Sequence, residues 1–260
     1  MLLVSAWEVR KLRVGLIADI HGNLLALETV LADLEHAEVD SLLCLGDVAA
    51  LGPQPSEVIA RLREIGCPSV LGNTDAWLLE GPPADPENLS GLAMSEIARW
   101  CADRLSGADW EYLIDCPLVA EQSLGDGGWL LGFHGSPRSF DEVISATLPD
   151  EELSRMLSGW GASMFAGGHT HVQLLRRHED SHLLNPGSVG LPGVGPGTSD
   201  LPVNRRVGWA EYAVIEVSGT HLSVELRRVQ VDVEQTLEAA RVSRMPHLDW
   251  WIGKWDAPVR

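Results

Sequence analysis

The stretch VGLIADIHGNLLALETVLADL, residues 14–34, contains the first strand and the first helix that we expect in the fold. Residues 14–18 form a short apolar run, which is typical of a buried strand. Leucines then recur at helical spacing, at Leu24, Leu27, Leu31 and Leu34. The stretch therefore predicts a strand, a polar turn that contains Asp19 and His21, and a helix.

The same alternation of strand and helix continues to residue 71. Apolar runs at 41–45 and 69–71 predict two more strands. Between them, we expect a helix that begins near Pro55 and ends at Gly66. This order of strands and helices predicts a parallel sheet with right-handed crossovers.

The second half of the chain is richer in strands. Two helices are expected within residues 91–113 and one within 149–161. Apolar segments on either side of polar or Gly-rich turns predict hairpins at 117–133, 172–184 and 210–231. We therefore predict an α/β (α+β) fold of two packed sheets with helices outside, and a functional or mobile Gly/Pro-rich loop at 191–207.

The composition restricts the partners of the chain. Its 260 residues include 19 Lys and Arg against 37 Asp and Glu, which gives a formal charge of -18. This charge repels polyanions, so we expect neither duplex nucleic acid nor an anionic membrane as the main partner. No apolar run approaches the ~18 residues of a membrane span. The cysteines lack CxxC spacing and no signal peptide is recognisable, so we expect reduced thiols and a cytoplasmic protein.

Side chains that can bind metal follow five expected strands, at residues 14–18, 41–45, 69–71, 129–133 and 163–166. They are Asp19, His21, Asp47, Asn73, His134, His169 and His171. Because the carboxyl ends of strands in α/β sheets meet in one crevice, we expect these side chains to converge. A single histidine is more often an ordinary surface or core residue. We keep that interpretation for His36, His178, His182, His221 and His247.

The chemistry of this set suits two metal ions. Imidazole and carboxylate ligands without thiolates favour Mn, Fe, Co, Ni or Zn and argue against a structural zinc site. The set is too large for one catalytic ion, but two ions that share a carboxylate could activate a bridging hydroxide to attack phosphorus. The spacing of two in Asp19–His21 and in His169–His171 would put both side chains of each pair on one face of an extended backbone.

Six motifs occur in a fixed order along the chain. They are DIHGN (19–23), GD (46–47), GN (72–73), HGSP (134–137), GHTH (168–171) and NPGSVG (185–190). Together they resemble the calcineurin-like metallophosphoesterase superfamily, and most of all its small bacterial and archaeal phosphodiesterases. The resemblance implies a four-layer α/β/β/α sandwich of two mixed β-sheets flanked by helices. It divides the chain into an N-terminal extension (1–12), the metallophosphoesterase domain (13–240) and a Trp-rich C-terminal tail (241–260).

The resemblance also implies a role for each candidate residue. Asp19, His21, Asp47 and His171 match the ligands of one metal ion, whereas Asp47 as the bridging ligand, Asn73, His134 and His169 match those of the other. Asp47, Asn73 and His134 are accordingly the expected catalytic residues. The expected cofactor is two divalent ions, Mn first, with Fe, Ni, Co or Zn as alternatives.

Two further positions bear on substrate binding. The family motif commonly reads Gly-Asn-His-Asp or Gly-Asn-His-Glu, whereas this chain has Gly72-Asn73-Thr74-Asp75. The missing histidine would ordinarily polarise the phosphate or protonate the leaving group, a contribution of about 10²- to 10⁴-fold. We expect Thr74 and Asn73 to contact the substrate and Asp75 to cap a helix or to act behind the ligands. Arg138 either contacts the phosphate or remains a surface residue.

The expected function is hydrolysis of a phosphodiester, or of a phosphomonoester, in a small nucleotide-like substrate. The alternative is a catalytically weak metal-binding scaffold or protein-interaction module on the same fold, which the Thr74 substitution motivates. The tail sequence LDWWIGKW contains Trp250, Trp251 and Trp255. We expect these rings to pack on the domain or on a second subunit, so a homo-oligomer is an open alternative.

Overall fold

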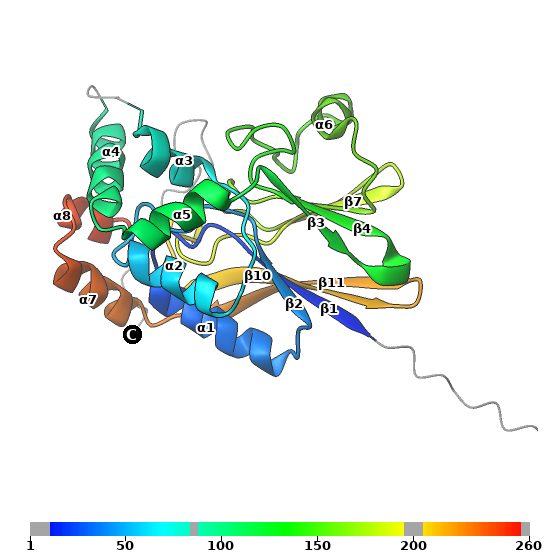
Figure 1. The fold of residues 1–260 in the computed structure, drawn as a ribbon, viewed down its shortest axis with the longest axis horizontal. Coiled ribbons are helices and arrows are strands. Elements are labelled where there is room, and N and C mark those ends of the chain that lie inside the picture. Colours follow the sequence, from blue (N-terminus) through cyan, green and yellow to red (C-terminus); the bar gives the residue numbers. More distant parts are fainter. Residues whose placement is uncertain (1–10, 84–87, 195–204, 256–260) are drawn as a thin grey trace, which may run out of the picture.

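Two mixed β-sheets pack face to face with helices on both outer sides, as Figure 1 shows. The computed structural model describes residues 11–83, 88–194 and 205–255. This arrangement confirms the predicted four-layer α/β/β/α sandwich. The expected N-terminal extension lies almost entirely outside the described residues.

The first sheet contains the strand of the opening stretch. Its order is β11–β10–β1–β2, with β1 at Leu12–Ile17, β2 at Ser41–Cys44, β10 at Trp209–Ser218 and β11 at His221–Gln230. β1 and β2 are parallel, whereas β10 and β11 are antiparallel to their neighbours. The strand expected at 69–71 is reduced to a single bridge from Ser69 to Cys44, because the chain turns into helix α3 (Asn73–Glu80) directly afterwards.

The second sheet comes from the strand-rich half of the chain. Its order is β3–β4–β5–β7–β6, with bounds Val119–Ser123, Trp129–Phe133, Met164–Ala166, Ser181–Asn185 and Leu174–His178. β4, β5 and β7 are parallel, and the edge strands β3 and β6 are antiparallel to them. The 3-10 turn at Gly125–Gly127 joins β3 to β4. A short ribbon of β8 (Gly193–Val194) and β9 (Arg205–Arg206) lies within the loop expected at 191–207.

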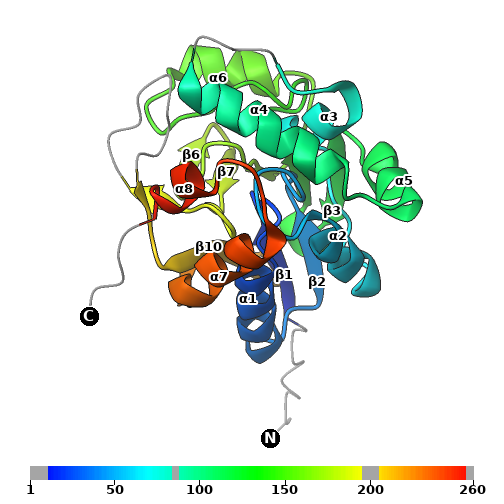
Figure 2. The same ribbon diagram turned by 90° about the vertical axis from the view of Figure 1, so that its left-hand side faces the viewer.

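Three apolar cores separate the layers. Between the sheets, Leu16 and Leu43 of the first sheet share a core with Met164 and Leu184 of the second. The core outside the first sheet is shared by α1 (Leu24–His36), α2 (Pro55–Glu64), α4 (Leu89–Ala102), α5 (Gly107–Asp115), α7 (Val233–Ser243) and α8 (Leu248–Ile252). Helix α6 (Asp150–Leu157) covers the second sheet, on the side opposite α1 in Figure 2. Each fully buried leucine contributes about 1.5–3 kcal/mol to this packing.

The turn after β1 carries the first two candidate ligands and is held at its far end by Asn23. The Asn23 side chain caps α1 by accepting a hydrogen bond from the backbone N–H of Ala26 at 3.1 Å. Its amide group donates to the carbonyl of Gly190 at 3.1 Å. The carboxyl end of β1 is thereby tied to the NPGSVG segment, which lies far away in sequence.

The Trp-rich tail packs on its own domain. Helix α7 runs across the expected boundary at residue 240, and Trp251 and Trp255 are buried in the core outside the first sheet. Trp250 is half-buried and is the ring of the three that remains accessible to a partner. Among the described residues, no helix is both long and apolar enough to cross a membrane. The four cysteines are free thiols.

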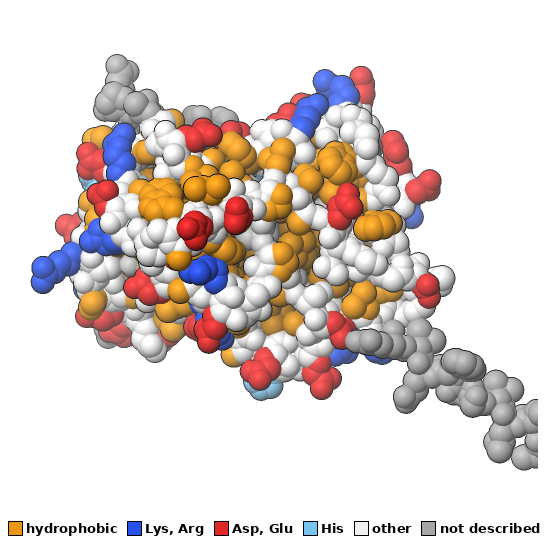
Figure 3. Space-filling model, viewed as in Figure 1, with side chains coloured by type: hydrophobic (Ala, Val, Ile, Leu, Met, Phe, Trp, Pro, Cys, Tyr) orange, Lys and Arg blue, Asp and Glu red, His pale blue; other side chains and the backbone are white. Residues whose placement is uncertain are grey.

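The surface reflects the acidic composition. Figure 3 shows Asp and Glu side chains spread over one face, whereas Lys and Arg occur in separate places without a continuous basic patch on the coloured residues. Some basic side chains of the protein are paired with carboxylates, as in the ion pairs of Arg61 with Glu28 at 2.8 Å and with Glu64 at 2.9 Å. An anionic ligand can therefore be attracted only by a local group of positive charges, such as bound metal ions or a single basic side chain.

Candidate metal centre

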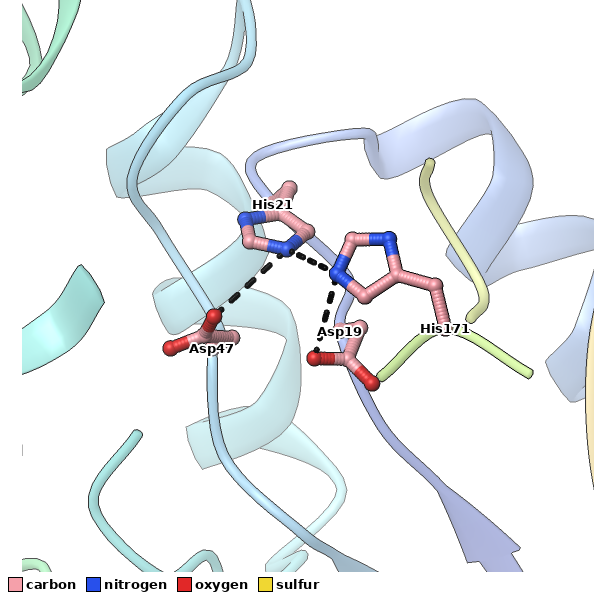
Figure 4. Close-up of side chains that lie close together, drawn as sticks. All are labelled: Asp19, His21, Asp47 and His171. Carbon is pink, nitrogen blue, oxygen red and sulfur yellow. Dashed lines mark hydrogen bonds and ion pairs between the residues drawn. The ribbon is translucent and has the colours of Figure 1, made fainter. Parts of the chain in front are cut away.

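The seven candidate ligands converge at the carboxyl ends of the strands. Asp19 and His21 follow β1, Asp47 follows β2, Asn73 begins α3, His134 follows β4, and His169 and His171 follow β5. Five of these side chains belong to buried residues, and the two from the last loop are half-buried. Figure 4 shows four of them pointing toward one another.

Asp19, His21, Asp47 and His171 form the first group of candidate ligands, and their nitrogen and oxygen atoms that could bind a metal all lie within 4.8 Å of one another. Nε2 of His21 lies 3.1 Å from Nε2 of His171 (Figure 4). Nε2 of His171 lies 3.4 Å from Oδ1 of Asp19, and Nε2 of His21 lies 3.6 Å from Oδ2 of Asp47. These separations leave room for one ion among the four side chains.

Both imidazoles of this group present a lone pair to the others. Nδ1 of His21 lies 3.0 Å from the carbonyl oxygen of Ala50, and Nδ1 of His171 lies 2.9 Å from that of Leu191. A carbonyl oxygen can only accept, so each Nδ1 carries the proton and each Nε2 carries a lone pair. Two such lone pairs 3.1 Å apart repel each other unless a cation lies between them. Burial lowers the pKa of His21 to about 4 and that of His171 to about 3, which keeps both in the neutral form that binds metal.

Asp47 links this group to a second group of candidate ligands. Its Oδ2 lies 3.5 Å from Nε2 of His134. Oδ1 of Asn73 lies 3.0 Å from Nε2 of His134 and 3.0 Å from Nδ1 of His169. Nδ1 of His134 donates to the carbonyl of Leu45 at 2.7 Å, which leaves Nε2 facing the site. One carboxylate oxygen therefore lies between two sets of candidate ligands.

The charges within the two groups are coupled. Burial alone would raise the pKa of Asp47, but the imidazoles around it, His134 first, hold that pKa well below its usual range. Burial alone would lower the pKa of His134, but Asp47 raises it to about 9. The pKa of Asp19 is raised well above its usual value, mainly by burial. Without metal, a proton on His134 therefore balances Asp47, and a bound ion would replace that proton.

The donor set fits two divalent ions. Oδ2 of Asp19 is buried and has no hydrogen-bond partner among the described residues. A buried acceptor left in this way costs about 1–3 kcal/mol, and more when it is charged. Coordination of an ion would satisfy this oxygen. Imidazole, carboxylate and amide oxygen without thiolate are ligands that suit Mn, Fe, Co, Ni and Zn.

The backbone at the ligands is left-handed and not extended. The φ angles are 55° at Asp19, 49° at His21, 55° at Asp47, 70° at His169 and 56° at His171. The expectation that an extended backbone aligns each ligand pair is therefore wrong. Such angles are uncommon for residues other than glycine, although Asp and His tolerate them better than most. The closeness of the paired ligands comes from tight turns, which cost about 1–3 kcal/mol each and are typical of functional sites.

Asp75 holds the loop that carries Asp47. Its carboxylate accepts hydrogen bonds from the backbone N–H of Val48 at 3.0 and 3.1 Å, of Ala49 at 3.2 Å and of Gly72 at 3.3 Å. It also closes the capping box at the start of α3. The expectation that Asp75 caps a helix is confirmed, and its further contacts join α3 to the ligand loop after β2.

The NPGSVG segment supports the ligand loops after β1 and β5. The backbone N–H of Gly190 donates to the carbonyl of Asp19 at 2.9 Å, and the hydroxyl of Ser188 donates to the same carbonyl at 2.8 Å. The side-chain amide of Asn185 donates to the carbonyl of Gly168 at 2.6 Å. The sequence motif identified the segment, whereas these partners could be found only in the fold.

Thr74 and Arg138 differ in their relation to the site. The backbone N–H of Thr74 donates to Oδ1 of Asp47 at 2.9 Å. The hydroxyl of Thr74 is buried and has no partner within the described parts of the chain. Arg138 is exposed, and its guanidinium donates to the carboxylate of Glu142 at 2.8–3.1 Å. To contact a phosphate, Arg138 would first have to leave this carboxylate.

Arg206 is a cation near the site that was not among the candidate site residues predicted from the sequence. Its charge acts on the first group: besides burial, which is the main cause, it lowers the pKa of His21. The sequence around it, VNRRV, matches no motif. The only available signal was its position at the end of the Gly/Pro-rich loop.

Comparison with known proteins shows what the chain is similar to. The model of the calcineurin-like phosphoesterase superfamily domain matches residues 12–201. An uncharacterized protein of Methanocaldococcus jannaschii is 27% identical over 249 residues, which cover 94% of this chain and 97% of that protein. The crystal structure of a metallophosphoesterase from Sphaerobacter thermophilus has a TM-score of 0.68 and 23% identity, covering 94% of this chain and 98% of that chain. A symmetrical bis(5'-nucleosyl)-tetraphosphatase of Pectobacterium carotovorum is 31% identical over 103 residues, 38% of this chain and 34% of that protein.

Proposed function

Because the chain belongs to the calcineurin-like phosphoesterase superfamily, we propose that it hydrolyses phosphoester bonds with two divalent metal ions. The observation that carries this proposal is the position of Asp47. Its Oδ2 lies 3.6 Å from Nε2 of His21 and 3.5 Å from Nε2 of His134. A carboxylate shared in this way between two groups of nitrogen and oxygen donors is what a pair of catalytic ions requires.

The proposed ligands divide into two sets that share one residue. Asp19, His21, Asp47 and His171 would hold one ion; Asp47, Asn73, His134 and His169 would hold the other. When bound, the two ions supply Lewis acidity and lower the pKa of water. Mn is the ion that we favour, with Fe, Ni, Co or Zn as alternatives.

The protein itself orients the donors before any ligand arrives. Backbone carbonyls hold Nδ1 of His21, His171 and His134, so each ring already turns its Nε2 toward the site, and of the three His134 must first lose a proton. The N–H of Thr74 holds one oxygen of Asp47 and leaves the other for the site. Asp47, Asn73 and His134 are the proposed catalytic residues because they line the side next to Thr74. The buried hydroxyl of Thr74 is available to a phosphate oxygen.

The proposed substrate is a small, nucleotide-like phosphodiester or phosphomonoester. The net charge of -18 disfavours a large polyanion such as duplex nucleic acid. The similarity to a protein named as a bis(5'-nucleosyl)-tetraphosphatase supports a nucleotide-like substrate, although it covers 38% of this chain. The four free thiols support a reducing compartment, so we also propose that the protein is cytoplasmic.

The second candidate is a metal-binding scaffold with little catalytic activity. It is favoured by Thr74, which stands where the superfamily commonly has a histidine that acts on the phosphate or leaving group. Against it, the whole ligand set is present and converges. A scaffold has no need of a set of this size with fixed tautomers.

Hydrolysis of bis-p-nitrophenyl phosphate by metal-stripped protein separates the two candidates. We expect a rate above the metal-free background when Mn, Ni, Co, Mg or Zn is added to the wild type. The Asp47→Asn variant should lose this rate and at least one bound ion while keeping its circular dichroism spectrum. The matched control Asp103→Asn changes an exposed carboxylate at the end of α4 and should behave as the wild type. No rate with any ion would favour the scaffold.

A further inference from the structure

Among the described residues, Arg206 contacts no carboxylate, although the protein is acidic. Other arginines contact a carboxylate, among them Arg13, Arg61, Arg176, Arg227 and Arg228. Nη1 of Arg206 is shielded from solvent and has no hydrogen-bond partner among the described residues. Burial lowers the pKa of its guanidinium. Since arginine stays charged at neutral pH, this position holds a partly desolvated charge that no described carboxylate compensates.

Strand β9 places Arg206 beside the segment that holds His171. Arg206 is paired with Gly193 of β8 in the register of the ribbon. Leu191, two residues before Gly193, accepts the hydrogen bond from Nδ1 of His171 at 2.9 Å. The backbone of Arg206 is therefore close to one of the supports of the first group of ligands.

The ring beneath Arg206 is tied to the segment that holds His21. The guanidinium carbon lies 4.9 Å from the ring centroid of Trp251. Nε1 of Trp251 donates to the carbonyl of Leu51 at 2.9 Å, and the preceding carbonyl, of Ala50, holds Nδ1 of His21. Arg206 thus lies on the side of the site that the two imidazoles of the first group form.

A guanidinium at this position is explained by an anion. Two divalent ions carry more positive charge than Asp19 and Asp47 cancel, so the loaded site repels a neighbouring cation. An anionic ligand between Arg206 and the ions would reverse this repulsion and would satisfy the shielded Nη1. Phosphate oxygens suit guanidinium, which can bind two of them at once.

The contacts of Arg206 with tryptophan rings do not satisfy the hydrogen-bond donors of its guanidinium. The guanidinium carbon of Arg206 lies 4.9 Å from the ring centroid of Trp251 and 5.7 Å from that of Trp255. These contacts are made through the ring faces and leave Nη1 of Arg206 without a hydrogen-bond partner among the described residues. Arg104 stacks on Trp100 at 3.7 Å in a similar way, but its Nη1 donates to the Trp100 carbonyl at 3.2 Å.

We propose that Arg206 binds the anionic phosphate of the substrate, beside the ion held by His21 and His171. This inference rests on the proposed function and adds to it a substrate-binding residue from outside the six motifs. Stacking on Trp251 orients the guanidinium, and its free edge faces the phosphate oxygens. Arg138, which is occupied by Glu142, is not needed for this contact.

The test measures binding of inorganic phosphate to the Mn-loaded protein by calorimetry. Replacing Arg206 by Gln should weaken phosphate binding by about tenfold or more, because a charge-assisted hydrogen bond is lost. Arg206→Lys keeps the charge and the contact with the rings but loses the paired N–H groups, so it should weaken binding severalfold. Arg104→Gln removes a stacked arginine on α4 and should leave phosphate affinity unchanged. Bound Mn, measured by elemental analysis, should be equal in all four proteins.

Kinetics on bis-p-nitrophenyl phosphate provide the second measurement. We expect Arg206→Gln to raise KM more than it lowers kcat, because the contact is present in the bound substrate. Unchanged phosphate affinity and KM in every Arg206 variant that folds would overturn the inference, whatever the loss of stability, and would make Arg206 a support of the C-terminal segment. If the Arg206→Gln variant fails to fold, the phosphate affinity and KM of the Arg206→Lys variant provide the test instead. Absence of hydrolysis by the wild type would instead contradict the proposed function and would leave the phosphate titration decisive for Arg206.

Discussion

Replacing Asp75 by asparagine should weaken metal binding although Asp75 is not a proposed ligand. Both oxygens of this carboxylate accept from buried backbone groups: Oδ1 from Val48 and Ala49, and Oδ2 from Val48 and Gly72. An asparagine offers one oxygen and one NH₂ group, which cannot accept. Whichever way the amide is turned, the N–H of either Ala49 or Gly72 loses its partner.

The magnitude follows from that orphaned donor. A buried N–H without a partner costs about 1–3 kcal/mol. The loss falls on the loop that positions Asp47, since Val48 and Ala49 follow it directly. Changes to groups that orient metal ligands typically cost about 10- to 100-fold in metal affinity, and we expect a loss in that range for Asp75→Asn.

The assay pairs urea unfolding of the metal-free protein with calorimetric titration of Mn, at pH 8. Burial raises the pKa of Asp75 to about 6, with Asp47 as the next cause, so the wild-type carboxylate is ionised at this pH. Asp109→Asn is the matched control, because Asp109 also closes a capping box but accepts from Ser56 and Ser106 through one oxygen, Oδ2. The control should leave Mn affinity unchanged. Wild-type stability together with wild-type Mn affinity in Asp75→Asn would refute the reasoning.

Two further predictions concern protons and packing at the site. Because Asp47 raises the pKa of His134 to about 9, an ion must displace a proton from His134 below that pH. Mn affinity should therefore rise about tenfold per pH unit from pH 7 toward 9, and a flat profile in calorimetric titrations would count against this coupling. A Cβ on Gly52 would lie 1.8 Å from the carbonyl oxygen of His21, so Gly52→Ala should lower the unfolding free energy by about 2 kcal/mol or more and reduce bound metal. The control Gly66→Ala, at a position with φ of 63° and open surroundings, should lower the unfolding free energy by only about 1 kcal/mol. Equal losses of unfolding free energy in the two variants, measured by urea unfolding, would contradict the packing argument.

The layers and most elements could be predicted from local periodicity. The helix expected from Leu24 begins there, and the hairpins expected after residue 117 occur as β3–β4, β6–β7 and β10–β11. Apart from the cap expected at Asp75, the extent of helix α3 was not predicted, because Asn73–Glu80 is short and adjoins an apolar run that has the composition of a strand. In the fold, that run contributes only the bridge from Ser69 to Cys44. Short segments of this kind are decided by tertiary packing, which periodicity does not contain.

The identity of the candidate ligands could be predicted, whereas the reason for their spacing could not. That a residue follows a predicted strand can be seen in the sequence, and on this ground Asp19 and His171 were both predicted as ligands. Only the fold shows that Nε2 of His171 lies 3.4 Å from Oδ1 of Asp19. The left-handed turns at these residues have no sequence signature, since Asp and His are compatible with several backbone conformations. Arg206 was missed for a related reason. Its place beside the site depends on the β8–β9 ribbon and on Trp251, contacts between segments that are distant in sequence.

We propose above that two ions sharing Asp47 make this chain a phosphoesterase. The most direct test of this proposal is titration of metal-stripped protein with Mn, in which bound ions per chain and the rate of bis-p-nitrophenyl phosphate hydrolysis are measured on the same samples. We expect two ions to bind per chain and the rate of hydrolysis to rise as the second ion binds. Saturation at one ion, or two bound ions with no rate above the metal-free background, would contradict the proposal.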